Sequence, residues 1–183
     1  MRIGLDIDGV LEDWAGHVLT TVNHAFDKNV KLVDVDFEKN YSTMGLFEDK
    51  KTMDNFLLSQ RTWWQDIPTL PGAIGAVFGL IFDGHTLELI TNRPEYTSIQ
   101  TRASVLEWWP GFTQPIISHV PDIKTVIDVQ VYVDDNHERL AEIVARERKA
   151  YGVRQPWNKK HEVALAKAGV VWLDSIADLA GEL

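Results

Sequence analysis

The 183-residue sequence contains no cysteine, so neither a disulfide framework nor a thiolate metal site can form. No apolar run approaches the ~18 residues of a membrane-spanning helix, and the first residues lack the features of a secretion signal. Basic residues are also scarce, because 18 lysines and arginines against 27 aspartates and glutamates leave a formal net charge of −9. We expect no stable nucleic-acid binding, because nucleic-acid backbones require a basic face. The absence of cysteine and of a secretion signal favours a cytoplasmic protein.

The composition that is present, 45% apolar and 25% charged, is that of an ordinary globular protein. Short apolar runs bounded by turn residues predict buried strands, and stretches typical of helices lie between several of them. This alternation predicts an α/β fold with a Rossmann-like, doubly wound, mostly parallel sheet. The strands are expected at Arg2–Ile7, Thr86–Ile90, Pro115–Ser118, Val129–Val133, Ala150–Val153 and, more weakly, Val170–Leu173, and the helices at Ala15–Phe26, Lys50–Trp64, Ala73–Phe82, Thr97–Trp109 and Glu138–Lys149.

Residues 14–68 interrupt the strand–helix rhythm. They contain two helix-like stretches separated by polar, irregular sequence, and they show no convincing buried strand. Pro68 and Pro71–Gly72 mark the return to the regular pattern. We therefore expect a small helical insertion after the first strand, on a core made of residues 1–13 and 69–183.

Asp6 and Asp8 are two residues apart at the end of the first predicted strand. Side chains at this spacing point the same way along a strand, so the two carboxylates can converge on one point. Two like charges held close together are costly unless a divalent cation or a shared proton offsets them. The alternative is a pair of carboxylates that merely caps a turn.

Further polar residues follow other predicted strands, and ligands bind at the carboxyl ends of the strands in open parallel sheets. Thr91 and Asn92 end one strand, Lys124 follows another, and Asp134–Asp135 end a third. Carboxylate oxygens suit Mg²⁺ beside a phosphate, whereas hydroxyl, amide and ammonium groups suit the phosphate oxygens. The alternative for Asp134–Asp135 is the capping of the following helix.

Taken in chain order, these motifs resemble those of the haloacid dehalogenase superfamily of phosphotransferases. The resemblance rests on the sequence from Asp6 to Leu11, the strand-end Thr91, Lys124, and Asp134–Asp135. Asp8 favours the phosphatase branches, because the dehalogenases lack an acid–base aspartate. The chain is also similar to the 5'(3')-deoxyribonucleotidases, at Asp6–Trp14, Trp63–Trp64 with Leu70–Ala73, Lys124–Val126 before Asp134–Asp135, and Gln155–Asn158.

The resemblance implies unequal roles for the two aspartates. Asp6 would be the nucleophile that forms an aspartyl phosphate, and Asp8 would be the acid and base that serves the leaving oxygen and then water. Asp6 must then be ionised while Asp8 starts protonated, so we expect Mg²⁺ and Lys124 to lower the pKa of Asp6. The resemblance also implies the Mg²⁺ ligands, which are Asp6, the main-chain carbonyl of Asp8, and Asp135. Asp134 would have a supporting position beside them. The implied phosphate-binding groups are Thr91, the main-chain N–H of Asn92, and Lys124.

Two positions depart from the deoxyribonucleotidase pattern. Asn92 stands where the mammalian enzymes carry a serine, and Asn136 stands where they carry an arginine. Arg93 is an additional cation to which the pattern gives no role. These departures leave the details of the phosphate clamp and the preferred nucleotide open.

The superfamily places a small cap over its active site at the position of the 14–68 insertion. A cap excludes water and contacts the leaving group. Its Trp14, Trp63 and Trp64 would form a pocket for a base, although tryptophans more often serve packing.

The leading hypothesis is a Mg²⁺-dependent phosphatase acting on nucleoside monophosphates, which are small phosphorylated substrates. The alternatives are a phosphatase for polynucleotide 3'-phosphates or sugar phosphates, and a non-catalytic nucleotide-binding module. The oligomeric state stays open, with a homodimer among the options.

Overall fold

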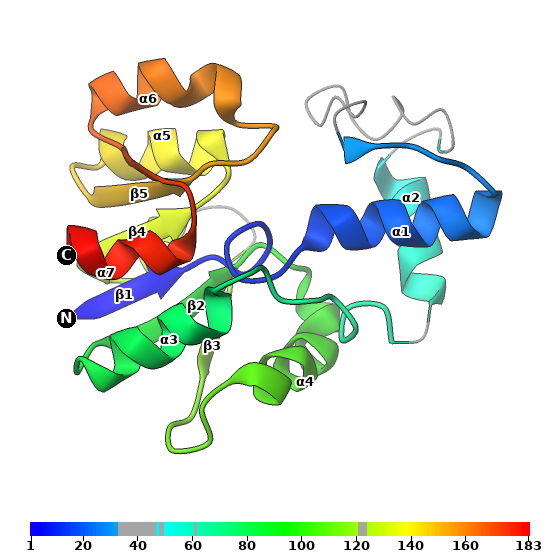
Figure 1. Ribbon diagram of the computed structural model, residues 1–183, viewed down its shortest axis with the longest axis horizontal. Helices are drawn as coiled ribbons and strands as arrows, with labels where there is room; N and C mark the ends of the chain where they lie inside the picture. Colours follow the sequence, from blue (N-terminus) through cyan, green and yellow to red (C-terminus); the bar gives the residue numbers. More distant parts are fainter. Residues whose placement is uncertain (33–46, 48–49, 61, 121–123) are drawn as a thin grey trace.

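The computed structural model describes residues 1–32, 47, 50–60, 62–120 and 124–183, and a six-stranded sheet lies at its centre (Figure 1). The strand order is β3-β2-β1-β4-β5-β6, and every neighbouring pair is parallel. The predicted α/β, Rossmann-like sheet is therefore confirmed. The strands are β1 Arg2–Leu5, β2 Thr86–Thr91, β3 Ile116–His119, β4 Val131–Asp134, β5 Lys149–Val153 and β6 Val171–Leu173.

Helices cover both faces of this sheet, as a doubly wound fold requires. One apolar cluster joins α3, α4 and α7 to one face, and another joins α5 and α6 to the opposite face. Figure 1 shows α5 and α6 above the sheet and α3 and α4 below it. These helices are α3 Ala73–Phe82, α4 Ser98–Trp108, α5 His137–Ala145, α6 Glu162–Ala168 and α7 Leu179–Glu182.

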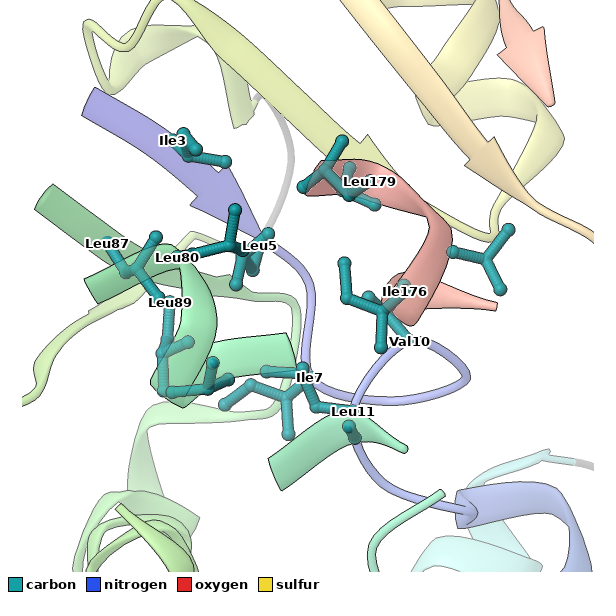
Figure 2. Packing of buried hydrophobic residues seen from close by; sticks show 14 of the residues in the cluster. Ile3, Leu5, Ile7, Val10, Leu11, Leu80, Leu87, Leu89, Ile176 and Leu179 are labelled. Atoms are coloured by element: carbon teal, nitrogen blue, oxygen red, sulfur yellow. The ribbon is translucent and has the colours of Figure 1, made fainter. Parts of the chain in front are cut away.

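The four inner strands, β2, β1, β4 and β5, are largely buried on both faces, and their side chains alternate between these two clusters. In β4, Val131 and Val133 join the cluster with α3, whereas Tyr132 joins the cluster with α5. Figure 2 shows Leu5 and Leu89, from neighbouring strands, packed within the first cluster. Burial on both faces explains why these strands read as continuous apolar runs in the sequence.

The strand order brings the ends of three strands together. The chain runs outward from β1 to β2 and β3, and then returns to place β4 on the other side of β1. Because all strands are parallel, β1, β2 and β4 end side by side at one edge of the sheet. Ligands bind at such a reversal of strand order, because the connecting loops diverge there and leave a crevice.

Between β1 and α3, the described residues form two helices, α1 Trp14–Phe26 and α2 Lys50–Ser59, which lie beside the sheet (Figure 1). They pack with Trp63, Trp64 and Ile67 in a third apolar cluster. These elements fall within the insertion predicted at 14–68, of which residues 33–46, 48–49 and 61 lie outside the described part. Among the described helices, none combines the length and the apolar character needed to cross a membrane.

Two helices end earlier than the sequence predicts. α2 stops at Ser59 rather than Trp64, and α5 stops at Ala145 rather than Lys149, which instead begins β5. After α5, Glu147 adopts a left-handed backbone conformation with φ of 57°, which breaks the helical path. No glycine or proline stands there to signal the stop. The short helices α6 and α7 were not predicted.

Leu89 is fully buried in the first cluster, so its replacement by alanine should leave a cavity. We expect Leu89→Ala to lower the free energy of unfolding by about 2–5 kcal/mol. Ile99, which is 83% exposed, provides the control, and Ile99→Ala should change the same quantity by less than about 0.5 kcal/mol. Urea denaturation followed by circular dichroism measures both, and equal effects would contradict the packing described.

Candidate active site

Lys124 joins the ends of the two central strands. Its Nζ lies 2.8 Å from Asp6 Oδ1 and 2.7 Å from Asp134 Oδ2. Asp6 follows β1 directly and Asp134 ends β4, so the parallel pairing of these strands brings the two carboxylates together. Lys124 itself begins a short 3-10 helix, η4 Lys124–Val126. All three side chains are buried, which strengthens the attraction between their charges relative to an exposed pair.

Asp135 adds a third carboxylate to this cluster. One oxygen each from Asp6, Asp134 and Asp135 lies within 4.8 Å of the others. Burial raises the pKa of Asp6 to about 7, although the charge of Lys124 opposes it. Burial and then the charge of Asp6 raise the pKa of Asp135 well above its usual value. We expected Lys124 to lower the pKa of Asp6. With Lys124 beside it the pKa is raised instead, because burial outweighs that one charge.

The three carboxylates fit a magnesium ion. Three buried acids beside one ammonium hold an excess of negative charge, which either protons or a divalent cation must offset. Carboxylate oxygens converging in this way are the donors that Mg²⁺ prefers. Asp134 already uses both oxygens, since Oδ2 bonds Lys124 and Oδ1 accepts from the N–H of Asn136 at 2.9 Å. The supporting position expected for Asp134 stays a prediction.

The loop after β1 and the segment after β5 hold Asp135 in place. Gly9 has a φ of 76°, which favours glycine, and a Cβ there would collide with Asp135 Oδ2. Trp157 Nε1 donates to that same oxygen at 2.8 Å, and Asn158 Nδ2 donates to the Asp135 carbonyl at 2.8 Å. Gln155 Nε2 donates to the Gly9 carbonyl at 2.7 Å. The Gln155–Asn158 segment is therefore part of the site's framework.

A different cation, Arg93, holds Asp8. Arg93 Nη2 lies 2.6 Å from Asp8 Oδ1, and Arg93 Nε donates to Asp8 Oδ2 at 3.0 Å. Arg93 is buried, whereas the Asp8 side chain is about one quarter exposed. The same Nη2 also lies 2.6 Å from Glu12 Oε2. Burial would lower the pKa of Arg93, but the charges of Asp8 and Glu12 outweigh burial and raise it.

Glu12 anchors Arg93 from the inside of the protein. Its side chain is fully buried, and its Oε1 accepts from Ser104 Oγ at 2.6 Å and from Trp108 Nε1 at 3.0 Å. Both donors lie on α4, so the network joins the loop after β1, the end of β2 and a helix of the core. Sequence reasoning missed Glu12 and assigned Arg93 no role. The one available signal was a glutamate directly after an apolar Val10–Leu11 pair.

Thr91 and Asn92 lie at the end of β2, beside β1. Thr91 is fully buried, and its Oγ1 accepts from the Arg93 N–H at 3.1 Å. Asn92 Nδ2 donates to the carbonyl of Val120 at 2.6 Å, which ties this strand end to the residue after β3. The structure thus places both residues at the predicted edge, and their contacts with phosphate remain a prediction.

Comparison with known proteins extends this description. Residues 1–174 match the family model of "5' nucleotidase, deoxy (Pyrimidine), cytosolic type C protein", which covers nearly the whole chain. The chain belongs to this nucleotidase family. A protein from Chlorobaculum tepidum, provisionally named a 5'(3')-deoxyribonucleotidase, is 22% identical over 150 residues, or 79% of this chain and 74% of that protein. The predicted family resemblance is therefore confirmed.

Solved structures place this nucleotidase-family chain among the haloacid dehalogenase folds. A hydrolase of that family from Deinococcus radiodurans, with bound phosphate and sodium, superposes with a TM-score of 0.65 at 16% identity, over 97% of this chain and 92% of that one. A haloacid dehalogenase-like hydrolase from Streptococcus pneumoniae gives 0.63 at 11% identity, over 100% and 98%. With the family match, these likenesses identify a phosphatase of the haloacid dehalogenase superfamily.

The three tryptophans predicted to line a base pocket are covered to different degrees in this nucleotidase-family chain. Trp63 and Trp64 are buried in the third apolar cluster, with ring centroids 5.0 Å apart. Trp14, at the start of α1, is half-buried and meets Trp63 edge-on with centroids 6.4 Å apart. Trp64 also faces the Arg93 guanidinium, 5.4 Å from the ring centre. Contact with a base stays a prediction, and Trp14 is the least covered candidate.

A hollow of about 360 Å³ lies beside Trp63, between α1 and the end of α2 with the residues that follow it. His17, Thr21, Phe56 and Asp66 contribute to its wall. None of the strand-end carboxylates lines it. Trp63 therefore borders a space that, over the described residues, is separate from the carboxylate cluster.

The Glu12–Arg93 pair should be important for stability. Glu12→Ala leaves Arg93 paired only with Asp8 and leaves Ser104 and Trp108 without their acceptor, so we expect the free energy of unfolding to fall by about 3–5 kcal/mol. Asp174 provides a matched control, because its pair with Arg154 lies at the surface and its side chain is 84% exposed. Asp174→Ala should cost less than about 1 kcal/mol. Chemical denaturation measures both variants, and a mild effect of Glu12→Ala would contradict a buried ion network.

Proposed function

We propose that this protein is a Mg²⁺-dependent phosphatase that hydrolyses nucleoside monophosphates through an aspartyl-phosphate intermediate. The observation that carries the proposal is the contrast between Asp6 and Asp8. Asp6 is buried beside Lys124 among other carboxylates, whereas Asp8 is partly exposed and bound to Arg93. Two carboxylates in such different surroundings are suited to different steps of one reaction.

In the first step, a carboxylate oxygen of Asp6 attacks the phosphorus atom. The bond between phosphorus and the nucleoside oxygen breaks, and Asp8 gives its proton to that oxygen. Lys124 balances the charge of Asp6 and of the phosphoryl oxygens, and Thr91 and the main-chain N–H of Asn92 position those oxygens. Positioning and charge balance contribute most of the rate enhancement in phosphoryl transfer.

In the second step, Asp8 takes a proton from water as the water oxygen attacks phosphorus. The bond between phosphorus and Asp6 breaks, so phosphate leaves and the Asp6 carboxylate is restored. In the geometry described, both oxygens of Asp8 accept from Arg93, which would hold the carboxyl group in place for this step. Arg93 is in turn fixed by Glu12, so it acts as a positioning residue for Asp8.

Asp6, Asp135 and the main-chain carbonyl of Asp8 are the proposed magnesium ligands, with Asp134 in support. The converging carboxylate oxygens support this assignment. When bound, Mg²⁺ neutralises phosphoryl charge and helps to align the transferring group.

We further propose that residues 14–68 serve as a cap on a catalytic core made of residues 1–13 and 69–183. The cap would exclude water from the reaction, and Trp14, Trp63 and Trp64 would form the pocket that stacks against the base. The net charge of −9 disfavours a polynucleotide substrate and favours a small one. The provisional name of the C. tepidum relative supports a nucleotide substrate.

Phosphate release from a substrate panel tests the proposal. The panel contains deoxyribonucleoside and ribonucleoside monophosphates, sugar phosphates and a 3'-phosphorylated oligonucleotide, each assayed with Mg²⁺. We expect a nucleoside monophosphate to have the highest kcat/KM, and Asp6→Asn to reduce it by about a thousandfold or more, because the nucleophile is lost. Asp174→Asn serves as the control. Its carboxylate is exposed and pairs with Arg154 at the surface, so this variant should retain activity.

Each other outcome of this assay removes a defined part of the proposal. Release that persists undiminished in Asp6→Asn, or no release from any substrate, would overturn the mechanism. A sugar phosphate or the oligonucleotide turning over fastest would preserve the chemistry and refute the nucleotidase assignment.

Magnesium should stabilise the protein in a pH-dependent way. Because the pKa of Asp6 is raised to about 7, the folded protein holds this proton more tightly than the unfolded chain does. Without Mg²⁺, this group therefore makes stability fall as the pH rises from about 4 to about 7. Mg²⁺ binds the ionised carboxylates, so saturating Mg²⁺ should raise Tm by about 5–10 °C near pH 8 and by much less near pH 5.

Thermal melts in Mg²⁺ and in a chelator, at both pH values, measure this effect. Asp6→Asn removes the titrating group and a ligand, so its melts should respond little to Mg²⁺ at either pH. An equal rise in Tm for Asp6→Asn and the unaltered protein would exclude Asp6 from the metal site.

A further inference from the structure

One face of the Arg93 guanidinium meets the ring of Trp64. The Arg93 Cζ atom lies 5.4 Å from the centre of that ring, and both side chains are buried. The hydrogen bonds from Arg93 to Asp8 and Glu12 use Nε and Nη2, which lie at the edge of the guanidinium plane. Nη1 has no hydrogen-bond partner over the described residues. The ring therefore adds a constraint that these hydrogen bonds lack, because it limits movement out of the guanidinium plane.

The cation and the ring belong to different parts of the chain. Arg93 follows β2 of the central sheet, whereas Trp64 packs in the third apolar cluster with α1 and α2. A cation that faces an aromatic ring away from water is held more strongly than one at the surface. The Trp64–Arg93 contact is therefore a direct link between the 14–68 insertion and the network that holds Asp8.

Helix α4 supports both partners of this contact. Gln100 Oε1 accepts from the main-chain N–H of Trp64 at 3.2 Å. Ser104 and Trp108 donate to the carboxylate of Glu12, which holds Arg93. The three α4 residues follow one another at intervals of four, so they share one side of the helix. A shift of the insertion against α4 would thus move the ring relative to the guanidinium.

The insertion joins the core through two short segments that pair with each other. The N–H of Asp13 donates to the carbonyl of Pro68, and the N–H of Leu70 donates to the carbonyl of Leu11, each at 2.8 Å. Such a pair can serve as a hinge, because a few residues at the ends of elements absorb a change in backbone angles. Glu12 lies between the two hydrogen bonds, and its side chain is fully buried. Rotation about this pair would part the ring from the guanidinium and leave Glu12 in place.

We propose that Trp64 is a positioning residue for Asp8, on which it acts through Arg93. With the insertion seated on the core, the ring holds the guanidinium in the plane that presents Asp8 to the leaving oxygen. When the insertion lifts to admit or release a nucleotide, Arg93 loses that constraint and Asp8 loses its fixed position. Acid catalysis is then available only under a seated insertion. The inference rests on the proposed function, which makes the insertion a cap and Asp8 the acid.

This role differs from stacking against a base. A base contact changes how tightly a nucleotide binds, whereas the position of Asp8 changes how fast the bound substrate reacts. The nucleoside oxygen must receive a proton from Asp8 as its bond to phosphorus breaks. In contrast, p-nitrophenolate is stable as an anion and leaves phosphorus without a proton. Loss of positioning should therefore slow the nucleotide reaction and spare that of p-nitrophenyl phosphate.

Single-turnover kinetics at saturating enzyme, with Mg²⁺, tests this difference. Rapid quenching measures the release of nucleoside from the best nucleoside monophosphate and of p-nitrophenol from p-nitrophenyl phosphate, so it follows the first step alone. We expect Trp64→Leu to slow nucleoside release by about tenfold or more, because general acid catalysis contributes about 10²–10⁴-fold. Release of p-nitrophenol should change by less than about twofold.

Three further variants separate positioning from packing and from base binding. Trp64→Phe keeps an aromatic face toward Arg93 and should retain most of the rate, whereas leucine fills space without such a face. Trp14→Leu alters the least covered candidate for the base pocket, so it should weaken nucleotide binding without changing the ratio of the two saturated rates. In Arg93→Lys, whose ammonium lacks a planar face, the added change Trp64→Leu should not alter that ratio further.

Gln100→Ala tests the same link with the ring left in place. It removes the acceptor of the Trp64 N–H and loosens the insertion on α4. We expect nucleoside release to slow relative to p-nitrophenol release by about threefold, which corresponds to one hydrogen bond. This variant decides the question if Trp64→Leu does not fold.

The possible results have distinct consequences. An unchanged ratio of the two saturated rates in Trp64→Leu, or in Gln100→Ala where the first variant does not fold, would overturn the inference. Equal rates in Trp64→Leu and Trp64→Phe would make Trp64 a packing residue and would also overturn it. The absence of release of either leaving group by the unaltered protein would overturn the proposed function itself, and this inference with it.

Discussion

The contact of the Lys124 ammonium with Asp6 and Asp134 is the interaction on which the rest of the site depends. Burial of an unpaired carboxylate costs several kcal/mol, and two ion pairs at 2.7–2.8 Å offset part of that cost. They do not offset all of it, because the pKa of Asp6 still rises to about 7. The cluster that includes Asp135 is thus left with an affinity for positive charge, which is the property a metal-assisted phosphatase requires of its site.

The parallel sheet makes this contact possible at a small conformational cost. β1 and β4 are neighbours, so Asp6 and Asp134 meet because each follows from the path of its own strand. No bend or strained backbone is needed to join residues more than a hundred positions apart. Near the carboxylates, Gly9 adopts a left-handed conformation that lets the loop pass close to Asp135.

A second buried network gives the two aspartates different partners. Asp6 and Asp8 are two residues apart, but Asp6 interacts with a cation from η4, and Asp8 interacts with Arg93 from the end of β2. Glu12 links Arg93 to α4, so the position of Asp8 depends on the packing of the core. The family resemblance gave Arg93 no role, because that role depends on neighbours that the motif does not contain.

The sequence by itself determined the sheet and the list of candidate residues. Strands buried on both faces are mostly apolar, so polar residues at their ends, such as Asp6 and Asp134, stand out. Tertiary structure decided which groups meet. It buries Glu12 with Arg93, and it leaves one side of the uniformly apolar α3 exposed. Sequence patterns report local periodicity, whereas burial and ion pairing depend on residues brought together from distant parts of the chain.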